Sequence, residues 1–409
     1  MQKLDSKKPS SKVSQNICVV LPLPHPPSAW TMVNWYWGEI CGIPFLLRNI
    51  FNLQRSGVES IIIYSDTENV GLYKNICKEN KITAKVTLET NVNKVIRATE
   101  NFSTLILNGG AIHATQEIEF GMDFTNQSDG ELVYSIAPKN MAETLDQIII
   151  GNKVSLSQPS NNQEPSINFL PGKNGSLINK PEDFLTQHKN LLKGSGLSND
   201  SFMDKTITRF FSRQLTRLFL KTPFSPNMIT VLSLFIGLIS AFFFLKGTYE
   251  NNIIGACLLL LSAWIDCTDG EIARLKFSES KIGGKLDILC DNLVHFSVFF
   301  AIGMGLYQST GNKNFLYFGV LAVLGSLISF LILSSSIIDK KEKVSANTTD
   351  PKKNNTLTDN IANRDFIYFL FFMSLIGKVD IFICITALGS NIFAAFLTYS
   401  KIKSLLHAS

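Results

Sequence analysis

The chain has 409 residues, of which 45% are hydrophobic and only 17% are charged, with 38 Lys and Arg against 33 Asp and Glu. Soluble proteins usually carry about a quarter charged residues. A chain this rich in hydrophobic residues and this poor in charged ones does not belong to the disordered, collagen-like or coiled-coil classes. The modest net charge of +5 gives no indication of nucleic-acid binding. Residues 1–224 are polar and mixed, whereas 228–265, 287–337 and 365–400 are almost continuously apolar, which predicts a soluble part joined to a membrane part.

The first expected domain covers residues 16–180. Residues 1–15 are expected to be a flexible N-terminus, and the apolar stretch Val19–Leu23 is too short and too interrupted by proline for a signal peptide. Short β-branched runs then alternate with amphipathic segments, which is typical of an α/β domain with a mostly parallel sheet. The expected strands are Ile17–Leu21, Ser60–Tyr64, Lys85–Leu88, Thr104–Leu107 and Glu131–Ile136, and Pro44–Ser56 is expected to be a helix.

Two segments of this domain resemble sugar-nucleotide and cytidylyl transferases. The first is Gly42–Val58, which precedes the apolar run Ile61–Ile63. The second is Leu105–Gly110, at the place where those enzymes carry a metal-binding aspartate, and here Asn108 or Gly109 stands in that position. The resemblance implies a nucleotidyltransferase-like fold.

The loop after the first strand departs from that resemblance. Such enzymes have a glycine-rich loop there, whose backbone N–H groups hold the triphosphate. The segment Leu21–Pro27 instead contains four prolines and no glycine, and proline supplies no N–H group. We therefore expect a degenerate nucleotidyltransferase-like domain without that activity, in which Asp66 and His113 are surface or turn residues.

The next segments connect the soluble and apolar parts. Residues 181–199 are expected to be a linker, and residues 200–222 a juxtamembrane helix. Within the latter, Asp204–Leu220 has apolar residues at helical spacing and arginines on the other face. Such a helix can lie among lipid headgroups, and packing on the protein itself is an equally good interpretation. Pro223 and Pro226 end it.

Six transmembrane helices are expected within residues 226–403, in a membrane domain that covers 200–409. A bilayer-spanning helix needs about 20 apolar residues. The block Phe366–Tyr399 is too long for one span and is interrupted at Gly377–Asp380, so it is expected to form two helices. The other four expected spans are Met228–Leu245, Asn252–Ile265, Ile288–Tyr307 and Phe315–Ile338.

The distribution of Lys and Arg predicts the orientation of these spans. Basic residues are concentrated in 205–221, 274–285 and 340–364, which are every second connection between the expected helices. Basic loops stay in the cytoplasm. We therefore expect an integral protein of the cytoplasmic membrane with both termini and the 266–291 loop facing the cytoplasm.

Four aspartates lie in one short window of the apolar part. Asp266 and Asp269 are three residues apart, and Asp287 and Asp291 are four apart. Each pair therefore shares one helix face, and a turn at Gly283–Gly284 can bring the pairs together. Carboxylates in an apolar pocket repel one another unless a cation compensates them, and an all-oxygen set favours Mg²⁺ or Mn²⁺ over zinc. Structural pairing with nearby lysines does not explain why these acids face apolar sequence.

The spacing of these acids resembles the signature of the CDP-alcohol phosphotransferase family. All eight specified positions are present, as Asp266-x-x-Asp269-Gly270-x-x-Ala273-Arg274, eight residues, and Gly283-x-x-x-Asp287-x-x-x-Asp291. The resemblance extends over roughly residues 200–400 and includes the Ser225–Asn227 entry to the first span. In that family a CDP-linked alcohol reacts with a hydroxyl acceptor, which forms a phosphodiester and releases CMP.

The resemblance implies a role for each of these residues. Asp266, Asp269 and Asp287 would hold two Mg²⁺ or Mn²⁺ ions, with Asp291 as a further ligand and the general base. It also implies a homodimer in a lipid bilayer, a CDP-alcohol donor and a hydroxyl acceptor. The residues expected to bind or surround the CDP group are Asn227, Asp269, Gly270, Ala273, Arg274 and Gly283.

Arg364 is a candidate for binding the acceptor. It lies where the Asn- and Lys-rich loop 339–362 re-enters the membrane, on the expected cytoplasmic side. Basic residues in this region bind the acceptor phosphate in family members that use inositol phosphate. A positively charged membrane anchor is an equally good interpretation.

Three functions remain in competition. The favoured one is transfer from a CDP-linked lipid such as CDP-diacylglycerol to a hydroxyl acceptor in phospholipid biosynthesis, the acceptor being a phosphorylated polyol. The fused domains also resemble bifunctional enzymes that make CDP-inositol and transfer it to inositol phosphate, which predicts CTP turnover by residues 1–199. A transporter with an intramembrane cation site is the non-enzymatic alternative, and it predicts ion-coupled flux without CMP release.

Overall fold

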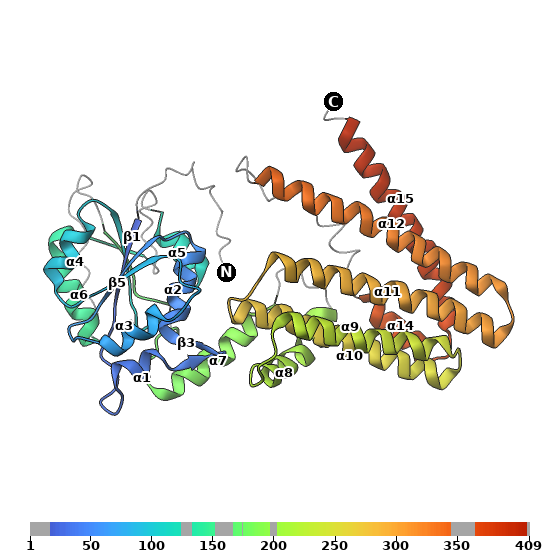
Figure 1. Ribbon diagram of the computed structural model, residues 1–409, viewed down its shortest axis with the longest axis horizontal. Helices are drawn as coiled ribbons and strands as arrows, with labels where there is room; N and C mark the ends of the chain where they lie inside the picture. Colours follow the sequence, from blue (N-terminus) through green and yellow to red (C-terminus); the bar gives the residue numbers. More distant parts are fainter. Residues whose placement is uncertain are drawn as a thin grey trace, which may run out of the picture. The chain divides into compact units, whose positions relative to one another are not determined.

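The computed structural model describes most of the chain as two compact units, Met1–Leu191 and Leu192–Ser409 (Figure 1). The expected flexible N-terminus, the beginning of the strand expected at Glu131 and the acceptor candidate Arg364 lie outside the described residues. The described ranges are 17–123, 133–151, 167–173, 175–196, 203–344 and 365–406, without the side chains of 334–344 and 404–406.

A six-stranded sheet forms the centre of the N-terminal unit, in the order β5-β4-β1-β6-β8-β7. Its strands are β1 (Ile17–Pro22), β4 (Ser60–Tyr64), β5 (Lys85–Glu89), β6 (Ser103–Leu107), β7 (Tyr134–Ile136) and β8 (Ile167–Leu170). All neighbouring pairs are parallel except β7 with β8. The expectation of an α/β domain with a mostly parallel sheet is confirmed, and β8 is an additional strand that the sequence analysis missed.

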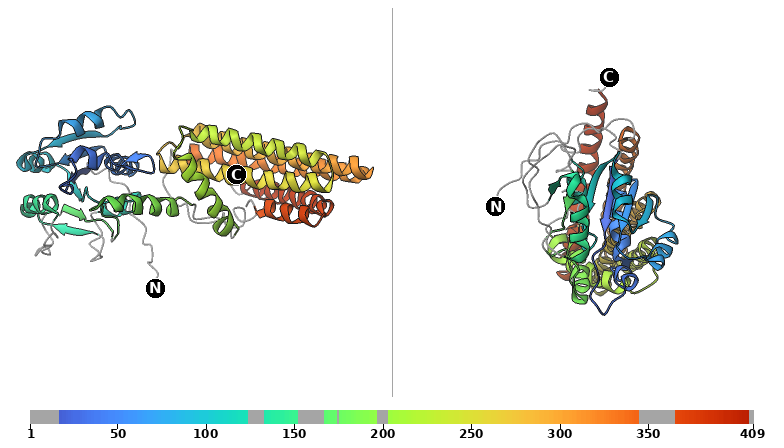
Figure 2. Two further views of the ribbon diagram at one scale, coloured as in Figure 1. Left: turned by 90° about the horizontal axis from the view of Figure 1, so that it is seen from below. Right: turned by 90° about the vertical axis from the view of Figure 1, so that its left-hand side faces the viewer.

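Helices lie on both sides of this sheet (Figure 2). Because successive strand residues face opposite sides, Val20, Ile62 and Ile106 pack on one side against apolar residues of α4 and α6. The helices are α1 (Met32–Tyr36), α2 (Phe45–Arg55), α3 (Val70–Cys77), α4 (Val92–Thr99), α5 (Thr115–Gly121), α6 (Met141–Ile150) and α7 (Pro181–Gly194), with a 3-10 turn at Pro138–Asn140 and a short hairpin of β2 (Glu39–Ile40) and β3 (Ile43–Pro44). The segment expected to be a linker, 181–199, is therefore largely helical.

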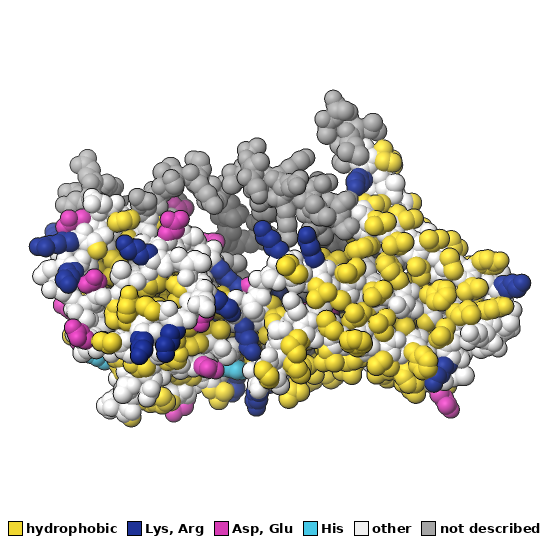
Figure 3. Space-filling model, viewed as in Figure 1, with side chains coloured by type: hydrophobic (Ala, Val, Ile, Leu, Met, Phe, Trp, Pro, Cys, Tyr) yellow, Lys and Arg dark blue, Asp and Glu magenta, His cyan; other side chains and the backbone are white. Residues whose placement is uncertain are grey.

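The described residues of the C-terminal unit form helices joined by short connections, and hydrophobic side chains cover much of the face shown in Figure 3. Its elements are a π-helical turn (Asp204–Thr208), α8 (Arg209–Phe219), α9 (Pro226–Leu245), α10 (Tyr249–Leu275), α11 (Lys281–Thr310), α12 (Lys313–Val344), α14 (Asp365–Leu375) and α15 (Val379–Leu406). Five of these, α9, α10, α11, α12 and α15, are long and apolar enough to cross a membrane.

The expectation of six spans is met only in part. The described residues of α14 form an apolar helix of 11 residues, which is shorter than a bilayer requires. The turn predicted at Gly377–Asp380 is present, since α14 ends at Leu375 and α15 begins at Val379. A sixth span therefore stays a prediction.

Glycines allow two of the long helices to approach each other closely. A Cβ at Gly303 of α11 would lie 2.7 Å from the Cα of Gly319 in α12, so the absence of side chains lets these helices meet backbone to backbone. The juxtamembrane helix α8 packs on α10 through its polar face, whereas Phe210 and Leu218 are each 60% exposed on the other face.

Candidate functional site

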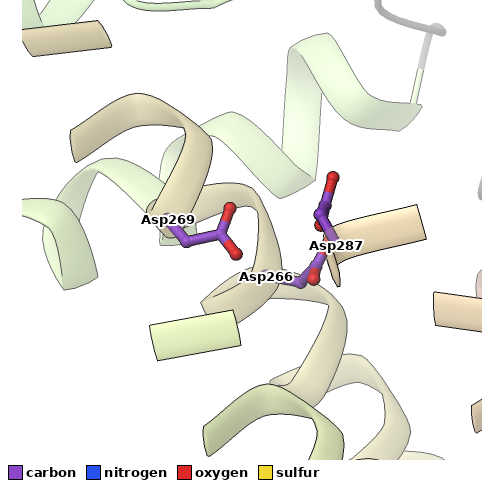
Figure 4. A group of neighbouring side chains, drawn as sticks. All are labelled: Asp266, Asp269 and Asp287. Atoms are coloured by element: carbon purple, nitrogen blue, oxygen red, sulfur yellow. The ribbon is translucent and has the colours of Figure 1, made fainter. Parts of the chain in front are cut away.

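Three carboxylates converge where α10 and α11 lie next to each other (Figure 4). Asp266 and Asp269 come from α10 and Asp287 from the second turn of α11, and one oxygen of each lies within 4.8 Å of the others. Asp266 and Asp269 are only 4% and 6% exposed. Since like charges this close destabilise one another and the ligand atoms are all oxygens, the cluster fits a hard divalent cation.

The entry to α11 brings Asp287 to this position. The Ser280 side chain caps the helix by accepting a hydrogen bond from the Gly283 N–H at 2.9 Å. A Cβ at Gly283 would lie 2.8 Å from Asn227 Oδ1, at the start of α9. Glycine at this position therefore allows α11 to begin directly against α9.

Two hydroxyl groups of α9 contact the cluster, and the sequence analysis missed both. The Thr230 hydroxyl donates a hydrogen bond to Asp269, and the Ser233 hydroxyl lies 3.4 Å from Asp266 Oδ1. The sequence gives no signal that distinguishes them, because Ser240 is a further hydroxyl residue of the same span and donates to the Gly255 carbonyl instead.

A cavity of about 230 Å³ adjoins the carboxylates. It is lined by every residue expected to surround the CDP group, namely Asn227, Asp269, Gly270, Ala273, Arg274 and Gly283. Asp287 lines it as well, and so does the α10–α11 connection through Ser278, Glu279 and Ser280, which had not been singled out. The cavity is thus a polar pocket lined largely by small side chains, and it borders the carboxylate cluster.

Asp291 lies one helical turn beyond Asp287 and is not part of the group of three carboxylates. It lines a separate, much smaller cavity together with Asp266 and His295. The His295 ring packs edge-on against Phe366, with ring centroids 5.0 Å apart.

Arg274 fixes the wall of the larger cavity. Its Nε and Nη2 atoms donate hydrogen bonds to the Ser195 carbonyl oxygen at 3.0 and 2.8 Å. Arg274 was expected to bind or surround the CDP group, and its bonds to Ser195 directly account for a role in shaping the pocket.

A second polar cluster lies on the face of α10 that contacts α8. Glu271 is fully buried, and it accepts hydrogen bonds from Arg209 Nη1 at 2.7 Å, from Ser212 at 2.8 Å and from Thr216 at 2.6 Å. All three donors belong to α8. This cluster was not anticipated from the sequence, and it fixes α8 against the helix that carries Asp266 and Asp269.

In the N-terminal unit, the proline-rich loop uses its backbone N–H groups internally. The Leu23 N–H donates to the Tyr64 carbonyl at 2.9 Å, and the His25 N–H donates to the Ile149 carbonyl at 3.0 Å. The His25 ring forms an exposed pair with Asp66 at 2.9 Å, so Asp66 is a surface residue as expected.

His113 is fully buried, which corrects the expectation of a surface or turn residue. Its Nε2 donates to the Asn108 carbonyl at 2.9 Å, and its Nδ1 lies 3.5 Å from Glu117 Oε1. Burial by itself raises the pKa of Glu117, but the hydrogen bond and charge of His113, together with the charge of Lys173, bring the pKa below its ordinary value. The pair fixes the loop after β6.

Comparison with known proteins relates the helical unit to one family. Residues 224–401 match the family model described as CDP-alcohol phosphatidyltransferase. The chain is 31% identical over 179 residues to a bifunctional IPC transferase and DIPP synthase of Thermococcus kodakarensis, a match that covers 42% of this chain and 39% of that protein. It is 32% identical over 136 residues to a protein of the same name from Aquifex aeolicus, covering 32% of this chain and 30% of the other. The match thus spans less than half the length of these relatives.

Among solved structures, the phosphatidylinositol phosphate synthase of Mycobacterium tuberculosis with CDP-DAG bound aligns at a TM-score of 0.36 and 16% identity. The alignment covers 47% of this chain and 92% of that one.

Proposed function

From the CDP-alcohol phosphatidyltransferase domain that residues 224–401 form, we propose that this protein is a divalent-metal-dependent CDP-alcohol phosphotransferase. It transfers the phosphoalcohol group of a CDP-alcohol to a hydroxyl acceptor and releases CMP. The observation that carries the proposal is that the six expected CDP-pocket residues line a single cavity, and that this cavity adjoins three converging carboxylates.

The four aspartates have separate roles in the proposed reaction. Asp266, Asp269 and Asp287 would hold two Mg²⁺ or Mn²⁺ ions, which when bound neutralise charge on the diphosphate and on the departing CMP. Asp291 takes the proton of the acceptor hydroxyl. The acceptor oxygen forms a bond to the phosphorus that carries the alcohol, the bond from that phosphorus to the CMP oxygen breaks, and CMP leaves with the electron pair.

We propose a CDP-linked lipid, such as CDP-diacylglycerol, as the donor and a phosphorylated polyol as the acceptor. The carboxylates belong to α10 and α11, which are long and apolar enough to cross a membrane, so a donor with acyl chains can reach them from the lipid phase. In the N-terminal unit, the loop after β1 commits the N–H groups of Leu23 and His25 to internal hydrogen bonds, which supports a domain without nucleotidyltransferase activity.

The names of the relatives favour a second candidate. Two of them are bifunctional IPC transferase and DIPP synthases. On this reading the N-terminal unit makes CDP-inositol, and the helical unit transfers its phosphoinositol group to inositol phosphate. The two candidates differ in the donor and in whether residues 1–199 turn over CTP.

The setting in the membrane is part of the proposal. We propose six spans in the cytoplasmic membrane, with the termini and the α10–α11 connection facing the cytoplasm, because the basic segments 205–221 and 274–285 flank that side. We also propose a homodimer, and Arg364 as the residue that binds a phosphate of the acceptor.

CMP release by the purified full-length protein tests the proposal. CDP-diacylglycerol and CDP-inositol are offered separately with Mg²⁺ or Mn²⁺, each with inositol phosphate or glycerol phosphate as the acceptor. Release with the lipid donor supports the first candidate, and release with CDP-inositol supports the second. We expect Asp287→Asn to abolish release, whereas Asp380→Asn, at the start of α15, retains it. No release with any pair would contradict both candidates.

A further inference from the structure

Ser278 lies in the connection between α10 and α11 and lines the 230 Å³ cavity. Its hydroxyl oxygen is buried, and it has no hydrogen-bond partner within the described part of the chain. A buried hydroxyl group is normally satisfied, because removing it from water without a new partner is unfavourable. A ligand in the cavity can provide the missing partner.

The backbone at this point is strained in a way that fixes Ser278. The Ser278 N–H donates to the Ala273 carbonyl at 2.9 Å and so closes the end of α10. The residue before it, Phe277, has a φ of 51°, in the left-handed region where glycine is usual at a helix end. A phenylalanine adopts this conformation only where its surroundings impose it, and such strain is concentrated at ligand sites.

Ser278 lies at the end of the cavity away from the cluster of Asp266, Asp269 and Asp287. With a rise of about 1.5 Å per residue, the six residues from Asp269 to Leu275 place the end of α10 about 9 Å from the carboxylate cluster. The diphosphate of the proposed donor belongs beside the carboxylates, so the nucleoside extends toward this end. Ser280, the neighbouring hydroxyl, already accepts a hydrogen bond from the Gly283 N–H.

We infer that Ser278 binds the nucleoside of the donor, through a hydrogen bond from its hydroxyl group to the base or the ribose. This inference rests on the proposed function, which places a cytidine nucleotide in the cavity. A hydroxyl group both donates and accepts, so it suits either part of the nucleoside. Ser278 belongs to the spacer between Arg274 and Gly283, in which the signature specifies no residue.

The test compares the full-length wild type with Ser278→Ala in detergent micelles. We measure the dissociation constant of CMP by calorimetry in the presence of Mg²⁺, and that of Mn²⁺ alone by electron paramagnetic resonance. Loss of one hydrogen bond predicts CMP binding about 3- to 10-fold weaker. Mn²⁺ binding is expected to be unchanged, because the carboxylates lie at the other end of the cavity. Ser309→Ala, in the last turn of α11, is the matched control and is expected to bind both ligands as the wild type does.

Deoxycytidine monophosphate separates the two possible contacts. An effect of Ser278→Ala that disappears with the deoxynucleotide assigns the contact to the 2′-hydroxyl group of the ribose, and one that persists assigns it to the base or to the rest of the sugar. Equal CMP affinities of variant and wild type would overturn the inference alone, as would a parallel loss of Mn²⁺ affinity, which would indicate a structural role. A wild type that does not bind CMP would overturn the proposed function and the inference together.

Discussion

The Thr230 hydroxyl on α9 donates a hydrogen bond to a carboxylate oxygen of Asp269 on α10. Both residues are buried, and a hydrogen bond to a carboxylate is stronger where water is excluded. The bond therefore fixes the direction in which Asp269 presents its remaining lone pairs to the carboxylate cluster. Helix α9, which contributes no carboxylate to that cluster, thus takes part in shaping it.

Thr230→Val should weaken metal binding while preserving the shape of the side chain. Loss of a group that orients a metal ligand typically lowers metal affinity about 10- to 100-fold. We expect a loss in this range for Mn²⁺ binding to the full-length protein, measured by electron paramagnetic resonance. The control is Thr310→Val, because the Thr310 hydroxyl donates to the Leu306 carbonyl at the far end of α11. Equal Mn²⁺ affinities for Thr230→Val and the wild type would contradict the prediction.

The acids of the cluster could be predicted from the sequence, but their hydroxyl partners could not. Spacing alone puts Asp266 and Asp269 on one helix face, and charged groups within apolar helices are expensive enough to indicate a function. Thr230 has no such cost, because its hydroxyl can bond to its own helix backbone. Its contact with Asp269 depends on how α9 packs on α10, which no local pattern reveals.

In the N-terminal unit, too, local sequence patterns predicted some features and missed those that depend on tertiary contacts. The strands β1 and β4 are runs of β-branched residues and were predicted almost to the residue. The four-residue strand β8 is flanked by polar sequence and is stabilised by its partners in the sheet, so it was missed. His113 was misjudged because its burial depends on tertiary contacts, including the bonds that Asn49 and Asn52 of α2 make to its backbone.

The Glu271 cluster predicts a large effect on stability. Glu271→Ala would leave the Arg209 guanidinium buried without the carboxylate that compensates it, and such a loss typically costs about 3–5 kcal/mol. We expect the free energy of unfolding of the full-length protein, measured in micelles, to fall by this order. The double variant Glu271→Leu with Arg209→Met removes both charges and should recover much of the loss.

The control for this variant is Glu250→Ala, which removes an exposed glutamate from the first turn of the same helix. Surface substitutions usually change stability by less than about 0.5 kcal/mol. If Glu271→Ala were no more destabilising than Glu250→Ala, the cluster would not hold α8 in place.

We predict that replacing Arg274 has a local effect on the segment around Ser195. Lysine cannot reproduce the pair of hydrogen bonds that the guanidinium makes to the Ser195 carbonyl. We therefore expect Arg274→Lys to open this segment and to increase cleavage by trypsin after Lys193 about tenfold. Mass spectrometry of a brief digest measures the rate. Arg217→Lys is the matched control, since Arg217 is exposed and bonds to Gln214. Equal cleavage rates for the two variants would show that Arg274 does not hold the segment.

The buried pair of His113 and Glu117 should make the stability of the N-terminal unit depend on pH. Despite burial, which raises it, the pKa of Glu117 is lower in the folded protein than the ordinary value of a glutamate, because of the hydrogen bond and charge of His113. A depressed carboxyl pKa contributes stability above the unfolded value, and this contribution is lost as the pH falls through the folded value. We expect the free energy of unfolding to decrease as the pH is lowered from about 5 toward 3. Urea unfolding followed by tryptophan fluorescence measures it, because three of the four tryptophans, Trp30, Trp35 and Trp37, lie in this unit.

Two glutamine variants of α5 isolate the contribution of this carboxyl. Glu117→Gln removes the titrating group, so its stability should depend less on pH in this window than that of the wild type. Glu119 lies on the same helix but is exposed, and Glu119→Gln should keep the wild-type pH dependence. Comparing the slopes of the two variants isolates the effect of position 117, because each variant removes one glutamate from the same helix. Parallel slopes for the two variants would mean that the ion pair with His113 does not depress the pKa of Glu117.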